Sequence, residues 1–234
     1  MERYNVFTRV HKGLRAFLFE TAMTVQQTDF SVTEEAEAVM GRIGEALYYF
    51  NQHSLYIERL LFPYIIDHNP GLIAIFRQQY QSNVVQAQRL RGVMNAFGHA
   101  ANQQEQVAAG HPILKAYTGF LITQLDSMAR EDNLLNAVLW RYYTDEELMA
   151  LEKEIVTKMS PRDLATLSKW VIRGMNNAEI IEWLRTIERC SVASVFISFF
   201  SSAEQELPEE RWQKIQEALA EGSSITEQGV SLGE

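Results

Sequence analysis

Apolar residues recur at steps of three and four along most of the chain, which is the spacing of one face of an α-helix. Four long stripes of this kind follow one another, over residues 7–25, 39–65, 73–97 and 114–142. No segment shows the two-residue alternation that is typical of a strand. The pattern therefore predicts an all-α fold in which four long helices pack as an up-down four-helix bundle.

Short breaks separate the stripes and set the expected domain organisation. Asn69-Pro70-Gly71 ends the second helix, and Gly110-His111-Pro112 is expected to open or kink the fourth. Beyond residue 142 several helix-start signals follow at short intervals, at Thr144, Ser160, Asn177 and Pro208. We therefore expect the bundle over residues 1–142, a helical C-terminal extension packed on it over 143–221, and a flexible tail over 222–234.

Charge and composition narrow the function classes. The net charge is −9, and residues 191–234 contribute most of it with 8 acidic and 2 basic side chains. This balance argues against a nucleic-acid partner, because such proteins normally carry a basic face. A single cysteine, Cys190, excludes an internal disulfide framework. No phosphate-binding loop and no nucleophile motif occurs, so we expect a non-enzymatic protein with no catalytic residues.

The location and assembly of the protein follow from its apolar segments. The N-terminus shows no apolar targeting segment, and the apolar run over residues 192–200 is too short to cross a bilayer. We therefore expect a cytoplasmic protein that does not enter a membrane. The same run is apolar on both sides, which leaves open a homo-oligomer or an unidentified protein partner.

Polar residues on the inner faces of the expected helices are the candidates for chemistry. His11 lies on the first stripe, His53 and Glu58 lie on opposite edges of the second, and Glu131 with Asp132 lies on the fourth. Four-helix bundles build metal sites from inward-facing histidines and carboxylates of this kind. The sequence predicts these five residues as possible metal ligands, and no separate cofactor-binding residue.

A structural interpretation stands beside the metal site. His11 and His53 can be core-edge histidines with satisfied hydrogen bonds, and Glu58 and Asp132 can be solvated acids. Glu131 is more constrained, because an unpaired buried carboxylate costs several kcal/mol. It needs a metal, a cation or a hydrogen-bond donor, and three nearby side chains could serve: Arg15, Arg130 and His11.

Three sequence strings, together with their order and spacing, resemble the hemerythrin-like cation-binding family over roughly residues 4–187. The first is Phe-Thr-Arg-Val-His-Lys-Gly-Leu-Arg at 7–15, and the second is His-Ser-Leu-Tyr-Ile-Glu-Arg-Leu-Leu-Phe-Pro at 53–63. The third is Met-Ala-Arg-Glu-Asp-Asn-Leu-Leu at 128–135. The Leu-Trp at 139–140 and the Tyr-Thr-Asp-Glu-Glu-Leu at 143–148 resemble the continuation in bacterial members.

The resemblance implies a four-helix bundle that holds a non-haem di-iron centre for binding oxygen or for sensing oxygen, iron or redox state. The family supplies about five histidines and two bridging carboxylates. Here the position four residues after His53, where the family has Glu, is Ile57, and the third helix supplies Phe76 and Tyr80 but no histidine. Ser127 stands where the fourth helix should supply one.

The incomplete ligand set leads to two expectations. The first is a degenerate family member that binds no cofactor and acts as a non-enzymatic binding or regulatory protein, with aromatic residues filling the former pocket. The alternative is a protein that binds a cation, iron above all, at a reduced site and serves oxygen, iron or redox sensing or storage.

Overall fold

The structure, a computed structural model, describes residues 3–230 and the side chains of residues 3–221. The fold is all-α, with no strand among the residues described. Two short π-helical segments, η1 and η2, interrupt the α-helices. In chain order the elements are α1 Thr8–Gln27, α2 Thr33–Tyr56, η1 Ile57–Leu61, α3 Pro63–Ile66, α4 Pro70–Gly98, α5 Gln103–Arg130, η2 Glu131–Leu135, α6 Asn136–Tyr142, α7 Asp145–Thr157, α8 Pro161–Gly174, α9 Asn177–Cys190, α10 Ala193–Glu206 and α11 Glu209–Val230.

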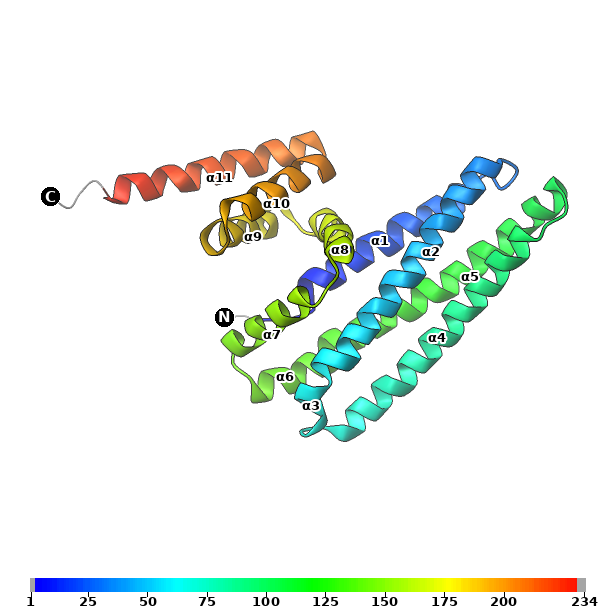
Figure 1. Cartoon of the computed structure of the whole chain (residues 1–234), viewed down its shortest axis with the longest axis horizontal. Coiled ribbons are helices and arrows are strands. Elements are labelled where there is room, and N and C mark those ends of the chain that lie inside the picture. The colour runs from blue at the N-terminus through cyan, green and yellow to red at the C-terminus, as the bar shows by residue number, and fades with distance from the viewer. Residues whose placement is uncertain (1–2, 231–234) are drawn as a thin grey trace.

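Four long helices, α1, α2, α4 and α5, lie side by side, and the shorter C-terminal helices gather on the α1 side (Figure 1). Helix α8 lies directly against α1, and α9 to α11 pack on one another farther from the four long helices. No helix among the described residues is long and apolar enough to cross a membrane. The C-terminal helices thus form an extension that contacts the long helices mainly through α8.

Side-chain caps explain where several helices begin. The Asn69 side chain accepts a hydrogen bond from the Leu72 N–H at the start of α4. Thr144 and Glu147 form the predicted capping box at the start of α7. Helix α9 begins at Asn177 as predicted, and Asn176 is its N-cap. The N-cap residue of α2 is Val32, which makes no side-chain cap, but Glu34 and Glu35 in the first turn complement the helix dipole.

The expectation that residues 110–112 open the fourth long helix was wrong. Helix α5 begins at Gln103, where Asn102 accepts a hydrogen bond from the Glu105 N–H, and it continues through Pro112. Gly110 is buried so tightly that a Cβ there would lie 2.5 Å from the Phe30 ring. Tertiary packing of this turn overrides the local tendency of proline to interrupt a helix.

The buried residues form three apolar clusters. One fills the half of the long helices nearer the α1–α2 and α4–α5 connections, and a second fills the half nearer α3, α6 and α7. The third holds α8 to α11 together. Between the first two clusters lies a layer of buried polar residues, which are His11, Asn83, Gln124, Ser127 and Glu131. This layer contains the candidate site.

The extension docks on α1 through an aromatic contact and a close helix crossing. Trp170 of α8 stacks on Phe17 of α1, with ring centroids 4.5 Å apart. Gly174 of α8 lies so near α1 that a Cβ would come within 2.4 Å of the Lys12 carbonyl oxygen. Trp183 of α9 packs on Phe199 within the extension, with ring centroids 4.9 Å apart.

The predicted C-terminal tail, residues 222–234, lies only partly within the residues that the structure describes. Helix α11 continues to Val230, whereas residues 231–234 lie outside the described residues. The predicted flexibility of 222–234 therefore stays a prediction.

Candidate metal centre

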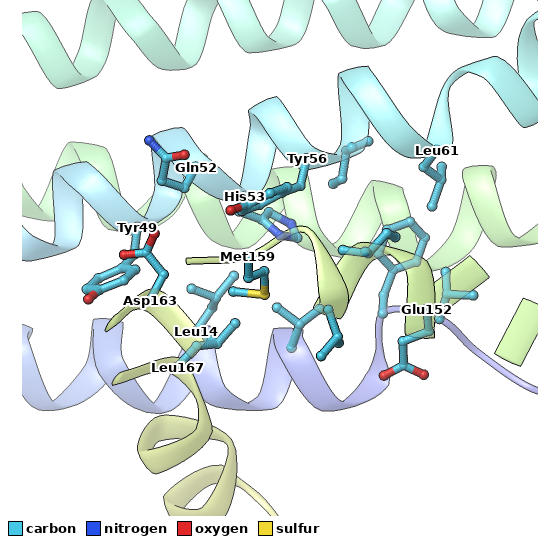
Figure 2. Close-up of a pocket in the computed structure, with 16 residues that line it drawn as sticks. Leu14, Tyr49, Gln52, His53, Tyr56, Leu61, Glu152, Met159, Asp163 and Leu167 are labelled. Carbon is cyan, nitrogen blue, oxygen red and sulfur yellow. The ribbon is translucent and has the colours of Figure 1, made fainter. Parts of the chain in front are cut away.

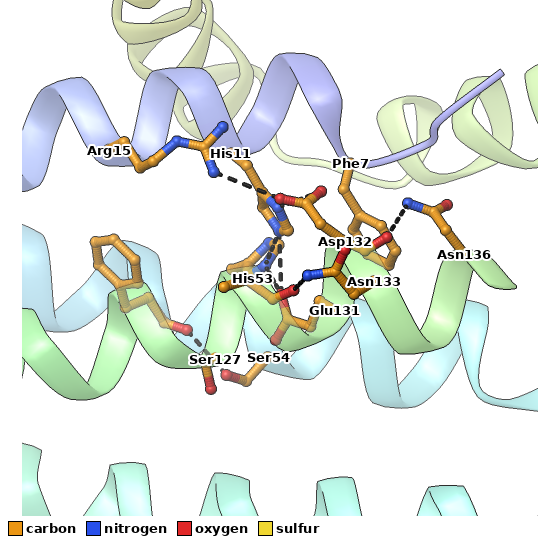
Figure 3. A network of polar contacts seen from close by, with 12 residues as sticks. Phe7, His11, Arg15, His53, Ser54, Ser127, Glu131, Asp132, Asn133 and Asn136 are labelled. Atoms are coloured by element: carbon orange, nitrogen blue, oxygen red, sulfur yellow. Dashed lines mark hydrogen bonds and ion pairs between the residues drawn. The ribbon is translucent and has the colours of Figure 1, made fainter. Parts of the chain in front are cut away.

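Three of the five predicted ligand residues meet between the two apolar clusters. Nε2 of His11 lies 3.0 Å from Oε2 of Glu131, and Nε2 of His53 also lies 3.0 Å from that oxygen. The two histidine Nε2 atoms are 3.2 Å apart. The residues come from α1, α2 and the first position of η2, and their side chains point toward one another (Figure 3).

The cluster is closed on most sides. His11 is 0% exposed and Glu131 is 1% exposed, whereas the side chain of His53 is 11% exposed. His53 is therefore the edge of the cluster that a molecule outside the core can reach. The Phe7 ring stacks on the His11 ring, with centroids 5.0 Å apart, and closes the α1 side.

Asp132 lies behind His11 and orients its ring. Oδ1 of Asp132 is 3.0 Å from Nδ1 of His11, in an off-axis contact without the alignment of a good hydrogen bond. Arg15 Nη1 lies 3.4 Å from the other Asp132 oxygen. In the neutral tautomer of His11 that carries its proton on Nδ1, this proton faces the carboxylate and the Nε2 lone pair faces His53 and Glu131. Metal-binding histidines are commonly oriented by a carboxylate in this way.

Tyr80 of α4 completes the surroundings of the buried carboxylate. Its hydroxyl donates a 2.8 Å hydrogen bond to Oε1 of Glu131. Burial and the neighbouring Glu131 raise the pKa of Tyr80 well above its ordinary value, so the hydroxyl keeps its proton. One carboxylate oxygen is thus held by Tyr80, and the other faces the two histidines.

The cluster has a charge preference of its own. Burial opposes the charged form of Glu131, but His53 and His11 outweigh burial and lower its pKa to about 2. Burial likewise opposes protonation of His11, but Asp132 and Glu131 outweigh it and raise the pKa of His11. The geometry favours positive charge between the three donor atoms, which a proton or a metal ion can supply.

Both π-helical segments adjoin the cluster. Segment η1 begins four residues after His53, and the Phe62 N–H donates to the Ile57 carbonyl five residues earlier. Segment η2 begins at Glu131, whose carbonyl accepts from the Asn136 N–H. A π-helical turn changes the angular relation of residues along a helix, and such turns are frequent at functional sites.

The remaining predicted residues lie elsewhere or act indirectly. Glu58 is not among the three converging residues; it lines a separate pocket between α2 and α4, on the side of Tyr80. Asp132 contacts His11 but is not one of the three converging residues. Of the suggested cations, Arg15 pairs with Asp132 and Arg130 lies over the Phe76 ring, so neither neutralises Glu131.

The other histidines and the two aromatic residues take structural positions. His68 stacks on Tyr142, with ring centroids 3.7 Å apart, and His99 lies at the end of α4. His111 is exposed on α5. Phe76 is fully buried, as expected of a core aromatic residue, but Tyr80 also hydrogen-bonds Glu131. The sequence could not predict this hydrogen bond of Tyr80. Helical periodicity places the Tyr80 ring in the core but does not show where the hydroxyl points.

The donor atoms are spaced so that they could hold one metal ion. Metal–ligand bonds of about 2.0–2.2 Å that meet at right angles put neighbouring donors about 3 Å apart. The triangle of His11 Nε2, His53 Nε2 and Glu131 Oε2 has sides of 3.0, 3.0 and 3.2 Å. Two histidines and one carboxylate on one face of an octahedron are the donor set of mononuclear non-haem Fe(II) sites.

Comparison with protein-family models, with curated protein sequences and with solved structures gave no significant match. The interpretation of the site therefore depends on its own geometry.

Proposed function

We propose that this chain is a hemerythrin-like helical protein that binds one divalent transition-metal ion, with iron as the expected metal, for sensing iron, oxygen or redox state. The ligands are His11 Nε2, His53 Nε2 and the Glu131 carboxylate. The observation that carries the proposal is their mutual spacing of 3.0–3.2 Å inside the core.

The chemistry of the donor atoms supports a cation. Two imidazole nitrogens and a carboxylate oxygen face one point, and they repel one another there unless a proton on one of the nitrogens or a metal ion lies between them. Asp132 supports the same conclusion, because it stabilises the His11 tautomer whose Nε2 lone pair faces that point. A bound Fe(II) would supply redox chemistry and further coordination positions for small ligands.

The resemblance to the hemerythrin-like family supports the proposal in a modified form. Each of the long helices α1, α2 and α4 contributes one side chain that contacts Glu131, namely His11, His53 and Tyr80, and Glu131 itself follows directly after α5. Tyr80 lies on the third long helix, where the family supplies a histidine. Tyr80 therefore replaces a histidine ligand and occupies the second oxygen of Glu131 with a hydrogen bond. Because both would be needed to hold a second metal ion, we propose one ion rather than two.

Metal analysis tests this proposal. The purified chain, prepared without chelators and incubated anaerobically with ferrous iron, should retain one iron per chain after desalting. Glu131→Gln and His11→Ala should each lower the metal content at least tenfold, whereas the matched control His111→Ala, at an exposed position of α5, should not. Two irons per chain with oxo-bridged absorption, or no iron in the unaltered chain, would contradict it.

A second function is favoured by the hydrogen bond from Tyr80. Because Tyr80 and a protonated histidine together satisfy Glu131, the cluster can also exist without metal as a polar anchor in the core. The chain would then be a non-enzymatic binding or regulatory protein. Under this alternative, Glu131→Gln would destabilise the fold while the unaltered chain bound no metal.

A further inference from the structure

An apolar cavity of about 100 Å³ lies between the long helices and the extension. Helices α1 and α2 with η1 form its floor, and α7, α8 and the residues between them form its roof (Figure 2). Half of the lining side chains are aliphatic, among them Val10, Leu14, Ile155 and Leu167. Apolar cavities of this order stay free of water and take up small apolar molecules.

The acidic residues of the lining are already engaged. Glu152 pairs with Arg9 at 2.8 Å and also accepts a hydrogen bond from Tyr4. Asp163 accepts a hydrogen bond of 3.1 Å from Tyr48. Two carboxylates beside an apolar space disfavour an anionic ligand, and the apolar walls offer no partner to a desolvated cation. The cavity therefore suits a neutral molecule.

Two polar groups of the lining, the Gln52 amide and the Tyr56 hydroxyl, have no hydrogen-bond partner among the described residues. Both residues belong to α2, one on each side of His53. A ligand with an apolar body and a single polar group would find hydrogen-bonding partners at this wall.

The cavity adjoins the candidate metal centre through His53. His53 is one of the lining residues and is also the one member of the cluster with an exposed side-chain edge. Met159, from the segment between α7 and α8, lines the same cavity as His53 (Figure 2). A molecule in the cavity would therefore touch the imidazole that holds the metal.

We propose that this cavity is a binding site for a small, neutral, largely apolar organic molecule, and that the extension creates the site by closing over His53. Binding there changes the surroundings of one metal ligand, so the bound molecule would modulate the metal centre. The link to the metal rests on the proposed function, whereas the binding site itself does not.

The test uses the full chain in its metal-free form, labelled with ¹³C in its methionine methyl groups, and benzene as the probe. We expect benzene to shift the Met159 methyl resonance and the His53 ring resonances in a saturable manner. The methyl groups of Met23 and Met149, each 51% exposed, should not move. Benzoate, which has the same ring and a negative charge, should bind at least tenfold more weakly.

A cavity-filling pair of variants provides the structural control. Leu167→Phe places a larger ring in the cavity and should weaken benzene binding at least tenfold, whereas Ile122→Phe, at a 61% exposed position of α5, should leave it unchanged. If Leu167→Phe does not fold, Ile155→Phe, at another position that lines the cavity, takes its place. Absence of a saturable shift at Met159, equal binding of benzoate, or unchanged binding in the filled variant would overturn the proposal. Because no metal is present, these outcomes are independent of whether the chain binds iron.

Discussion

The hydroxyl of Tyr80 donates a 2.8 Å hydrogen bond to Oε1 of Glu131, and both side chains are buried. This contact joins α4 to η2 across the polar layer. In its absence one oxygen of a buried carboxylate would have no donor, which is costlier than losing a hydrogen bond that water can replace.

Tyr80→Phe should therefore destabilise the metal-free chain by about 1–3 kcal/mol, since it keeps the ring and removes only the donor. Urea unfolding measures the change. Tyr142→Phe is the matched control, because Tyr142 is 44% exposed, and it should change the free energy of unfolding by less than about 0.5 kcal/mol. Equal stability of the two variants would show that Glu131 does not depend on Tyr80.

A second prediction concerns Asp132, which contacts Nδ1 of His11 at 3.0 Å. Asp132→Asn keeps the shape of the side chain but removes the charge that orients the imidazole and makes it more basic. Loss of such a partner typically costs about 10- to 100-fold in metal affinity. Competition with a metal chelator should show this loss, whereas Asp126→Asn, at an exposed site on α5, should bind metal as the unaltered chain does.

Much of the helical architecture could be predicted because burial imposes its own periodicity. The stripe that begins at Phe7 and the capping box of Thr144 and Glu147 are local patterns, and the structure confirms both elements. The convergence of His11 with Glu131 was weighed as a polar network, since a carboxylate on an apolar stripe needs a partner. These inferences needed only one helix at a time.

The remaining features depend on contacts between helices. Glu58, five positions after His53, does not join His53, whose carboxylate partner is Glu131 on a different element. The π-helical turn after His53 does not follow from average helix spacing, and the continuation of α5 through Pro112 depends on its packing against Phe30. Single-helix periodicity contains no information about such pairings.

The crossing of α1 and α8 yields a third prediction. A Cβ at Gly174 would lie 2.4 Å from the Lys12 carbonyl oxygen, and backbone atoms cannot move aside as a flexible side chain can. Gly174→Ala should destabilise the chain by about 1–3 kcal/mol, the usual cost of overpacking. Gly41→Ala in α2 is the matched control, because nothing lies within 4 Å of its Cβ position, and it should stabilise the chain by about 0.5–1 kcal/mol. Destabilisation of both variants to the same extent would argue against a crossing that requires glycine.

The ion pair between Lys12 of α1 and Glu179 of α9 should make the stability of the chain pH-dependent. Partial burial opposes the charged form of Glu179, but the hydrogen bonds from Lys12 and from the Asn176 N–H outweigh it and lower the pKa of Glu179. A lowered pKa in the folded state stabilises the fold above the ordinary value of 4.5, and this contribution is lost as the pH falls through the lower, folded value. The relevant window therefore lies below pH 4.5.

Glu179→Gln isolates this effect, because glutamine can keep the capping box with Asn176 while it removes the charge. At pH 7 the variant should be less stable than the unaltered chain by up to about 1 kcal/mol, the range for partly exposed ion pairs. The difference should shrink as the pH falls below 4.5, since protonation then removes the same charge from the unaltered chain. Urea unfolding of both proteins between pH 7 and pH 3 measures it. A difference that stays constant over this range would show that the stabilisation does not depend on the charge of Glu179.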